Sequence, residues 1–363
     1  MAARSIASPG IQTPGESPKT TAAPSQAGSI GCSLPVFNWG WVTNGPTTSV
    51  VGQNGFLAVD SGRFTADPTG VFSEDSTGRF ASQQTPVLYG DNFTSATYDP
   101  AYRRWLPAPP SHVLADGSAY VYELELPDGS AYEIHLVEVA SATDRMISHM
   151  PYDNAYSVIA FQPAGVYVEP ILHRSGLPTG VWLLDPKTRS LTAYPNSMNS
   201  TWQTVAGGGV WGGPGGQAGD SLTRLDLSTG LVTIWFQHAV QGAEFEGFGY
   251  GVSLIGFDRS FIGFDRSFRP VVEVFPPGPA PNAPQQSPGA PQVWIVRAPG
   301  DASELSGIAL ARDHALSFGV SDPLGLWLAG ADGIYVYTDS GFQRIAPLAP
   351  SPTPNYTIEG ACV

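Results

Sequence analysis

The sequence predicts an all-β protein, with one large domain behind a short N-terminal tail. Of its 363 residues, 42 are glycine and 34 proline, a share well above average and typical of a chain with many turns. Hydrophobic residues make up 42% of the chain, enough for a large core. No segment keeps a helical apolar period over eleven or more residues. We therefore expect many short strands joined by tight turns.

Two apolar strands joined by a polar, small-residue turn recur seven times along the chain. The copies are GFLAVDSGRF (55–64), ATYDPAYRRWL (96–106), HLVEVASATDRMI (135–147), VWLLDPKTRSLTAY (181–194), LTRLDLSTGLVTIWF (222–236), VWIVRAPGDASEL (293–305) and IYVYTDSGFQRI (334–345). Five of the six intervals between corresponding turn residues are 39 to 47 residues long, and the sixth, from Asp226 to Arg297, is 71. One four-stranded blade of a β-propeller occupies about 40 residues, and each copy would form its two outer strands. The sequence therefore predicts a seven-bladed β-propeller of four-stranded antiparallel blades over residues 32–363.

A closed ring requires the two ends of the chain to meet, because an unpaired edge strand promotes aggregation. We expect Thr357 and Ile358 to pair beside Val36 and Phe37 in one blade. Cys32 and Cys362 are the only cysteines and flank the domain, whereas free cysteines more often lie within core strands. A disulfide between them is the preferred hypothesis, and two free thiols are the alternative.

The N-terminal tail, residues 1–31, consists mainly of Ser, Pro, Thr, Ala and Gly and is expected to be disordered. It has no apolar run of the length of a signal peptide core or a membrane span. A disulfide nevertheless favours an oxidising compartment. We expect an extracytoplasmic protein, secreted or surface-tethered, whose export signal or anchor would be missing from this chain. A cytoplasmic location is the alternative.

The charge of the chain narrows the choice of partners. A formal net charge of −14, from 31 acidic and 17 basic residues, disfavours nucleic acid, which requires a basic face. The sequence contains no HExxH, GxSxG, phosphate-loop or dinucleotide motif. We expect a monomer that binds a protein or a small-molecule ligand, with no membrane span in this chain.

Four histidines lie in the connections from an outer strand to the next inner strand. These are His112, His149, His238 and His314, 11 to 17 residues after their respective turn residues. Such connections lie on one face of a propeller, around the central channel, where imidazoles could bind an anionic ligand or a divalent metal. The preferred interpretation is structural, because histidine at this place in WD-type propellers is hydrogen-bonded within its own blade. His135 and His173 are expected to be ordinary strand or loop residues.

Three segments of the chain resemble blades of bacterial propeller families. VAGGGVWGGPGGQAGDSLTRLDLSTGLVTIWF (205–236) and GLWLAGADGIYVYTDSGFQRI (325–345) resemble blades of the streptogramin-lyase, NHL and sensor-propeller kind. HVLADGSAYVYELELPDGSAYEIHLVEVASATDRMI (112–147) is similar to blades of TolB-like propellers. The resemblance covers most of residues 36–348 and implies the fold, which enzymes, binding proteins and scaffolds share. No catalytic residue of streptogramin lyases maps onto this chain.

The longest interval contains a perfect duplication, IGFDRSFIGFDRSF (255–268), followed by a proline-rich segment at 269–292. Seven is an odd number, so a copy absorbed into a strand would reverse the faces of all residues beyond it. We expect one copy to continue the strand and the other to be extruded at the edge of the blade. The proline-rich segment is expected to be an inserted loop.

Together these features favour an extracytoplasmic binding or interaction module, with its protein or small ligand at the channel face. A metal-assisted lyase or hydrolase and a sensor or assembly module of a tethered protein are the alternatives. An enzyme is less expected than a binding module. No cofactor is predicted, although the four histidines could hold a divalent metal.

Overall fold

The computed structural model describes residues 31–44, 47–91, 96–171, 180–197, 200–214, 221–237, 251–259, 268–275, 292–305, 316, 319–330, 333–338, 341–347 and 356–363. Contacts divide the chain into Met1–Ile30 and a compact unit, Gly31–Val363, which holds all of these residues.

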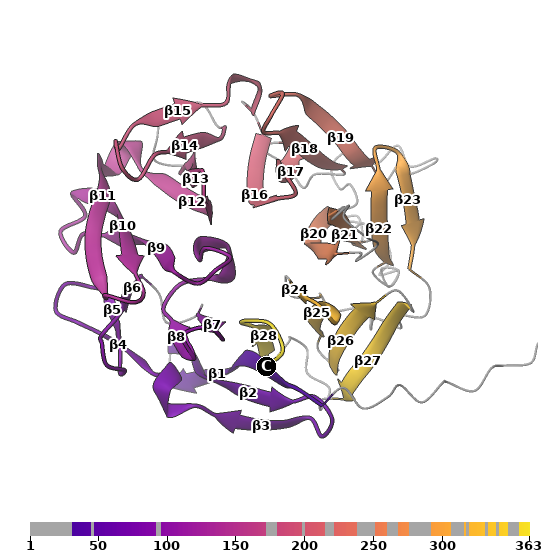
Figure 1. Ribbon diagram of the computed structural model, residues 1–363, viewed down its shortest axis with the longest axis horizontal. Helices are drawn as coiled ribbons and strands as arrows, with labels where there is room; N and C mark the ends of the chain where they lie inside the picture. Colours follow the sequence, from indigo (N-terminus) through magenta and orange to yellow (C-terminus); the bar gives the residue numbers. More distant parts are fainter. Residues whose placement is uncertain are drawn as a thin grey trace, which may run out of the picture. The chain divides into compact units, whose positions relative to one another are not determined.

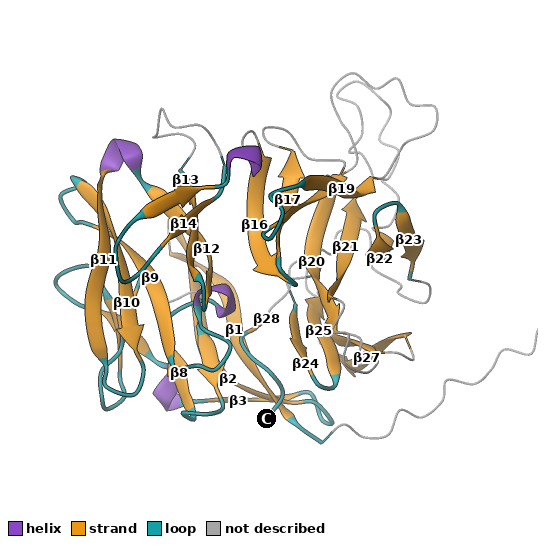
Figure 2. Cartoon of the chain, turned by 45° about the horizontal axis from the view of Figure 1, so that its top comes forward, coloured by secondary structure: helices purple, strands orange, loops and turns teal. Residues whose placement is uncertain are grey.

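The regular secondary structure of the described residues consists almost entirely of β-strands. They are β1 (Ser33–Asn44), β2 (Thr47–Ala58), β3 (Arg63–Ala66), β4 (Phe72–Glu74), β5 (Phe80–Ser82), β6 (Tyr89–Gly90), β7 (Thr97–Asp99), β8 (Arg104–Leu106), β9 (Ala119–Glu125), β10 (Ala131–Glu138), β11 (Thr143–Pro151), β12 (Tyr156–Gln162), β13 (Gly165–Pro170), β14 (Trp182–Leu184), β15 (Leu191–Ala193), β16 (Ser200–Ala206), β17 (Gly209–Pro214), β18 (Ser221–Asp226), β19 (Val232–Gln237), β20 (Gly251–Arg259), β21 (Phe268–Phe275), β22 (Gln292–Ala298), β23 (Asp301–Glu304), β24 (Val320–Asp322), β25 (Gly325–Gly330), β26 (Gly333–Thr338), β27 (Gly341–Pro347) and β28 (Tyr356–Ile358). The helices among the described residues are single 3₁₀ turns: η1 (Pro68–Gly70), η2 (Pro110–His112), η3 (Tyr152–Asn154) and η4 (Pro195–Ser197) (Figure 2). None of them is long and apolar enough to cross a membrane.

The strands form antiparallel sheets arranged around a ring, which confirms the predicted seven-bladed β-propeller (Figure 1). Five of the sheets have four strands, in the orders β28-β1-β2-β3, β12-β13-β14-β15, β16-β17-β18-β19, β20-β21-β22-β23 and β24-β25-β26-β27. Apolar clusters fill the space between neighbouring sheets, for example where Val121 and Ile134 meet Val158 and Val166. Burial between blades therefore holds the ring together.

The prediction of four strands per blade is wrong in two adjacent places. The β11-β10-β9 sheet has three strands, and its innermost position is taken by the segment around η2, which makes a single bridge from Val113 to Tyr120. Pro107, Pro109 and Pro110 precede that bridge and have no backbone N–H to donate to a sheet. Beside it, β4–β6 and β7–β8 form separate three- and two-stranded sheets.

The seven predicted hairpins all form, and side-chain hydrogen bonds explain the recurring aspartate at their turns. The Oδ1 atom of Asp185 accepts the backbone N–H groups of Lys187, at 2.7 Å, and Thr188, at 3.3 Å. Asp99 and Asp226 accept the N–H groups two and three residues ahead in the same way. An aspartate at this place substitutes for a backbone turn, which is why the repeat is visible in the sequence.

Glycine begins the second strand of several sheets for a steric reason. Gly165 has a φ of 144°, and a Cβ atom there would lie 2.7 Å from the carbonyl oxygen of Leu184. Gly325 has a φ of 151°, with the carbonyl oxygen of Tyr337 at 2.4 Å from a Cβ atom. Only glycine allows this backbone angle and so close an approach of the third strand.

The ring closes as predicted. β28 pairs antiparallel with β1, with Ile358 opposite Val36 and Thr357 opposite Phe37. Cys32 and Cys362 form the disulfide beside this pairing, with their Cα atoms 5.7 Å apart. Both chain ends of the compact unit are thus tied into one sheet.

A buried aspartate fastens the C-terminal segment to the last sheet. Asp322 is only 4% exposed, and its Oδ2 atom accepts the indole N–H of Trp327 at 2.8 Å and the backbone N–H of Cys362 at 3.0 Å. Its Oδ1 atom accepts the N–H groups of Leu324 and Gly325. One carboxylate therefore satisfies four donors, one of them beside the disulfide.

Replacing Asp322 by alanine should lower the free energy of unfolding by about 3–5 kcal/mol, because four donors lose their acceptor, including the buried indole N–H of Trp327. Denaturant unfolding monitored by tryptophan fluorescence measures the change. Glu304→Ala, which removes an exposed acid on β23, is the control and should change the value by less than about 0.5 kcal/mol. Equal effects of the two substitutions would contradict this role of Asp322.

The duplicated segment does not form one continuous strand. The first copy continues β20 to Arg259, and β21 begins at Phe268, the last residue of the second copy, where the two residues face each other across the pair. The first copy therefore continues the strand, as expected. The fate of the second copy lies outside the described residues, since 260–267 are not among them.

The prediction of a loop at 269–292 is wrong for its first residues. Residues 269–275 belong to β21, which pairs with β22. Pro270 is opposite Phe257 of β20, and the pairing of β21 with β22 begins only at the next residue, so the strand tolerates a residue without an N–H group. The valines that follow it are buried. Residues 276–291 lie outside the described part of the chain.

Candidate functional site

A pocket of about 620 Å³ lies between the β9–β11 sheet and the β12–β15 sheet. Leu114, Ala119, Leu136 and Phe161 form its apolar wall. Its other lining residues are Tyr102, Ser118, Glu138, Ala140, Arg145, Gln162, Pro163, Ala164, Gly165, Asp185, Pro186 and Lys187. This volume falls in the range of small-molecule sites, roughly 300–1,000 Å³.

The pocket opens among the turns that join strands within each sheet. It reaches from the β7–β8 turn at Tyr102, past the β10–β11 turn at Ala140, to the β14–β15 turn at Lys187. In an antiparallel sheet these turns lie at the opposite edge from the connections that lead to the next sheet. The pocket is therefore on the other face from the connection that carries His112.

Four charged side chains line this pocket, two of each sign. The carboxylates belong to Glu138 and Asp185, and the cations are Arg145 and Lys187. Hydrogen bonds from the backbone N–H and side chain of its own turn hold the pKa of Asp185 below its usual range. Arg145 donates from Nη1 to the carbonyl oxygen of Pro186 at 2.9 Å, which joins the two sheets across the pocket.

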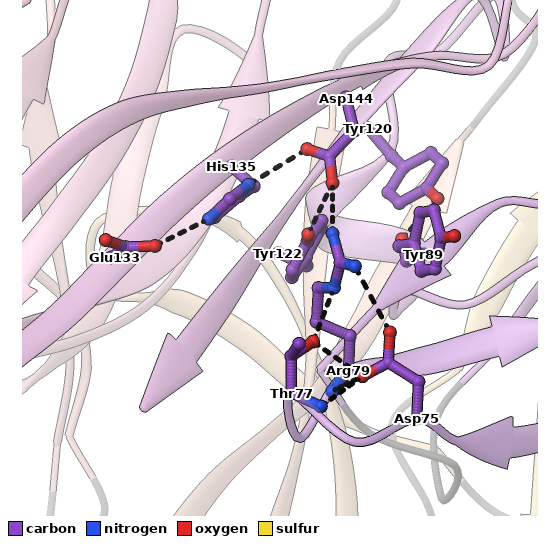
Figure 3. Close-up of polar contacts among 9 residues, drawn as sticks. All are labelled: Asp75, Thr77, Arg79, Tyr89, Tyr120, Tyr122, Glu133, His135 and Asp144. Carbon is purple, nitrogen blue, oxygen red and sulfur yellow. Dashed lines mark hydrogen bonds and ion pairs between the residues drawn. The ribbon is translucent and has the colours of Figure 1, made fainter. Parts of the chain in front are cut away.

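A second polar cluster lies on the other side of the β9–β11 sheet, facing β4–β6 (Figure 3). His135 on β10 is at its centre, with Nδ1 2.9 Å from Oδ1 of Asp144 and Nε2 3.0 Å from Oε2 of Glu133. The imidazole stacks on Tyr122, with ring centroids 4.8 Å apart. The chain of contacts ends at His149, whose Nδ1 is 2.9 Å from Oε1 of Glu133.

Arg79, just before β5, connects this cluster to the neighbouring sheet (Figure 3). Its Nη1 lies 3.5 Å from Oδ2 of Asp144, and its Nη2 lies 3.2 Å from Oδ2 of Asp75. The guanidinium also sits over the ring of Tyr89, 4.1 Å from its centroid. Arg79 thus makes charged and cation–π contacts in one place.

The arrangement gives His135 a structural task. Burial alone would lower its pKa, but the hydrogen bonds and charges of Asp144 and Glu133 outweigh burial and raise it. With a carboxylate at each ring nitrogen, both nitrogens of the imidazolium donate and neither has a free lone pair. The imidazolium of His135 is therefore suited to joining β10 and β11 within its own sheet, and not to binding a metal or accepting a proton from a substrate.

The predicted channel-face histidines do not form one group among the described residues. His112 is 8% exposed in η2, and its Nε2–H donates to the carbonyl oxygen of Val158 at 3.1 Å. Burial lowers the pKa of His112 to about 4, partly offset by that hydrogen bond, so the ring is neutral at pH 7. This contact with the next sheet favours the structural interpretation of His112.

The described residues do not test whether the four predicted histidines bind a metal. His149 lies within the outer strand β11, so its predicted place in a connection between sheets is wrong. Its side chain is half exposed at the end of the cluster around His135. His238 and His314 lie outside the described residues, as does His173. Within the ranges that the structure describes, no group of three or more His, Cys, Asp or Glu side chains is placed to hold a metal ion. A ring of four histidines stays a prediction.

Sequence reasoning missed three glutamates that link neighbouring sheets. Glu123 on β9 accepts the backbone N–H of Val158 on β12 at 2.5 Å. Glu169 on β13 accepts that of Trp202 on β16, and Glu273 on β21 accepts that of Leu316, each at 3.1 Å. The signal is visible in hindsight: YVYEL, VYVEP and PVVEV each place one acid inside an otherwise apolar second strand.

Burial gives these glutamates unusual pKa values. It raises the pKa of Glu123 and that of Glu273 to about 7, although each accepts a backbone N–H that works in the other direction. Burial raises the pKa of Glu169 as well. Glu359, which follows β28 and is 1% exposed, has its pKa raised by burial to about 8. Several acids between the sheets are thus partly or wholly protonated near neutral pH.

The fold and the pocket define a seven-bladed β-propeller with a ligand-sized cavity between two of its blades. No protein-family model and no curated protein sequence matches this chain.

Solved structures show similarity of fold. The β-propeller domain of the Trilobed protease from Pyrococcus furiosus is 9% identical, with a TM-score of 0.44, over 87% of this chain and 86% of that one. An oligogalacturonate lyase in complex with manganese is 12% identical, with a TM-score of 0.42, over 87% and 86% of the two chains. TolB from Acinetobacter baumannii is 11% identical, with a TM-score of 0.37, over 90% and 83%.

Proposed function

We propose that this protein is a β-propeller binding module that takes a small ligand in the pocket between the β9–β11 and β12–β15 sheets. The observation that carries the proposal is the pocket itself, which combines a ligand-sized volume with an apolar wall and a few polar groups at its rim. This combination is the usual composition of a binding site. The proposed site replaces the channel face as the first place to look for a ligand.

The proposal includes an extracytoplasmic location. Its support is the disulfide between Cys32 and Cys362, since such bonds persist in oxidising compartments and are rare in the cytosol. Probing the accessibility of a surface tag on intact cells of the source organism tests this location. Protection of the tag until the cells are lysed would argue for the cytoplasmic alternative.

Filling the pocket should abolish ligand binding without unfolding the protein. Ala140 lines the pocket from the β10–β11 turn, so Ala140→Trp puts a large ring into the space that a ligand would occupy. A fragment library screened by ligand-observed NMR should give binders to the native protein that lose at least about tenfold in affinity, or 1.4 kcal/mol, in this variant.

The matched control is Leu231→Trp, which adds the same ring at an exposed position in the turn between β18 and β19, outside the pocket. Its fragment affinities should equal those of the native protein. Fragments that bind the native protein and Ala140→Trp equally well would place the binding site elsewhere and overturn the proposal.

A further inference from the structure

We propose that the ligand of this pocket is an amphipathic anion, with a carboxylate or phosphate head and a short apolar body. This inference rests on the proposed function of the pocket and adds the chemical class of its ligand. Two observations carry it: the unequal engagement of the charged side chains at the rim, and the apolar wall beside them.

The two carboxylates at the rim are engaged by their own turns. Oδ1 of Asp185 accepts two backbone N–H groups at 2.7 and 3.3 Å, and Oε2 of Glu138 accepts the hydroxyl of Ser141 at 3.3 Å. These bonds hold the hairpin turns in shape. Part of the hydrogen-bonding capacity of both acids is therefore already used by the protein.

The two cations at the rim are engaged much less. Arg145 has five N–H donors, and one hydrogen bond, to the carbonyl oxygen of Pro186, is made with the rest of the described chain. Neither Arg145 nor Lys187 has a carboxylate within ion-pair distance among the described residues, whereas Arg79, Arg224 and Arg297 each have one. Arg145 and Lys187 line the same pocket, so both positive charges can act on one ligand.

Arg145 and Lys187 lie beside the apolar wall of the pocket, where they could bind the head of an amphipathic anion. Arg145 is half-buried, and it lies opposite Leu136 of the apolar wall in the β10–β11 pairing. A guanidinium forms parallel hydrogen bonds with a carboxylate or phosphate, and such charge-assisted bonds are stronger than neutral ones. An anion bound here would accept hydrogen bonds from Arg145 and Lys187, while its apolar part would cover Leu136 and Phe161.

The test compares probes that differ only in the head. Isothermal titration at low salt with octanoate, octyl phosphate, octanol and octylammonium should show both anions binding at least tenfold more tightly than octanol, with octylammonium weakest. Acetate and inorganic phosphate, which lack the tail, should bind at least tenfold more weakly than the matching octyl anion. Raising the salt concentration should weaken the anions selectively.

Variants connect the effect to the two cations. Lys187→Gln keeps the hydrogen bond from Arg145 to Pro186, and should reduce the affinity for octanoate about threefold to tenfold while leaving that for octanol unchanged. Arg145→Gln should reduce it further. Arg63→Gln removes one positive charge from β3, outside the pocket, and is the control that should change nothing.

The outcomes separate this inference from the proposed function. If octanol and octylammonium bind as tightly as octanoate, and Ala140→Trp abolishes all three, the pocket binds ligands but the anion inference is wrong. If acetate or phosphate binds as tightly as the octyl anions, the apolar body is not part of recognition and the inference is equally wrong. If no probe binds in a manner sensitive to Ala140→Trp, the inference fails together with the pocket.

Discussion

Removing the disulfide by Cys32→Ser and Cys362→Ser should lower the free energy of unfolding by on the order of 5 kcal/mol. The bond joins residues 330 positions apart, so in its absence the unfolded chain gains the freedom of a very long loop. For a domain of this size the loss corresponds to a fall of about 5–8 °C in the melting temperature. Calorimetry of the native and double-substituted proteins measures both quantities.

The two single substitutions are the natural controls, because each already removes the bond. Each should be destabilised as much as the double variant, and reduction of the native protein by dithiothreitol should have the same effect. Equal melting temperatures for native and double-substituted protein would show that the pairing of β28 with β1 closes the ring without help from the disulfide.

The second large effect is the dependence of stability on pH. The protein should be most stable near pH 5 and should lose several kcal/mol of its free energy of unfolding between pH 5 and pH 8. Burial raises the pKa of Glu123 and Glu273 to about 7, and that of Glu359 to about 8, from an ordinary value of 4.5. The stabilising contribution of each is complete below pH 4.5 and is lost as the pH rises through its raised pKa.

Other ionisable groups determine how wide the pH range of greatest stability is. His135 has a raised pKa, so its contribution is also lost as the pH rises beyond its ordinary value of 6.5. In Asp75, Glu133 and Asp144, hydrogen bonds and nearby cations outweigh burial and lower the pKa, to about 2 for Asp75. Their contributions are lost as the pH falls, and stability also falls below pH 6.5 because burial lowers the pKa of His112 to about 4. The optimum therefore lies between the two sets, since the loss from the three glutamates toward pH 8 is larger.

Urea unfolding at pH 5 and pH 8 measures the difference, since one unit of pKa shift corresponds to about 1.4 kcal/mol. Glu359→Gln should bring the two values closer by on the order of 2–4 kcal/mol, because an amide cannot ionise. Glu273→Gln should act in the same direction and still accept the N–H of Leu316. Glu304→Gln, an exposed acid on β23, is the control that should leave the difference as it is. Equal stability of the native protein at pH 5 and pH 8 would refute the prediction.

The hairpins could be predicted because their signals are local. An aspartate that accepts the N–H groups two and three residues ahead needs only its own turn, as Asp185 and Asp226 show. Closure by β28 and β1 followed from a general requirement of rings, and the two cysteines at the ends of the domain marked the place. The fold, the period and the disulfide were therefore within reach of the sequence.

The irregular part of the ring was not predictable in the same way. The segment before β9 matches the repeat in length, and only its position beside β12 shows that η2 replaces an inner strand. His135 looked like an ordinary strand residue, because Asp144 follows it across a hairpin and Glu133 precedes it by two. Arg79 joins the same cluster from 65 residues before Asp144, a distance that no local pattern encodes.

The sequence by itself determined the blade, because period, turn chemistry and alternating apolar residues act within about 40 positions of the chain. Tertiary structure alone decided where a ligand could bind, because the pocket is lined by Leu114, Arg145 and Lys187, which come from a loop, a strand and a turn far apart in the sequence. It also decided the charge of Glu123 and Glu273, since burial between sheets sets their pKa values and no neighbour in the sequence reports burial.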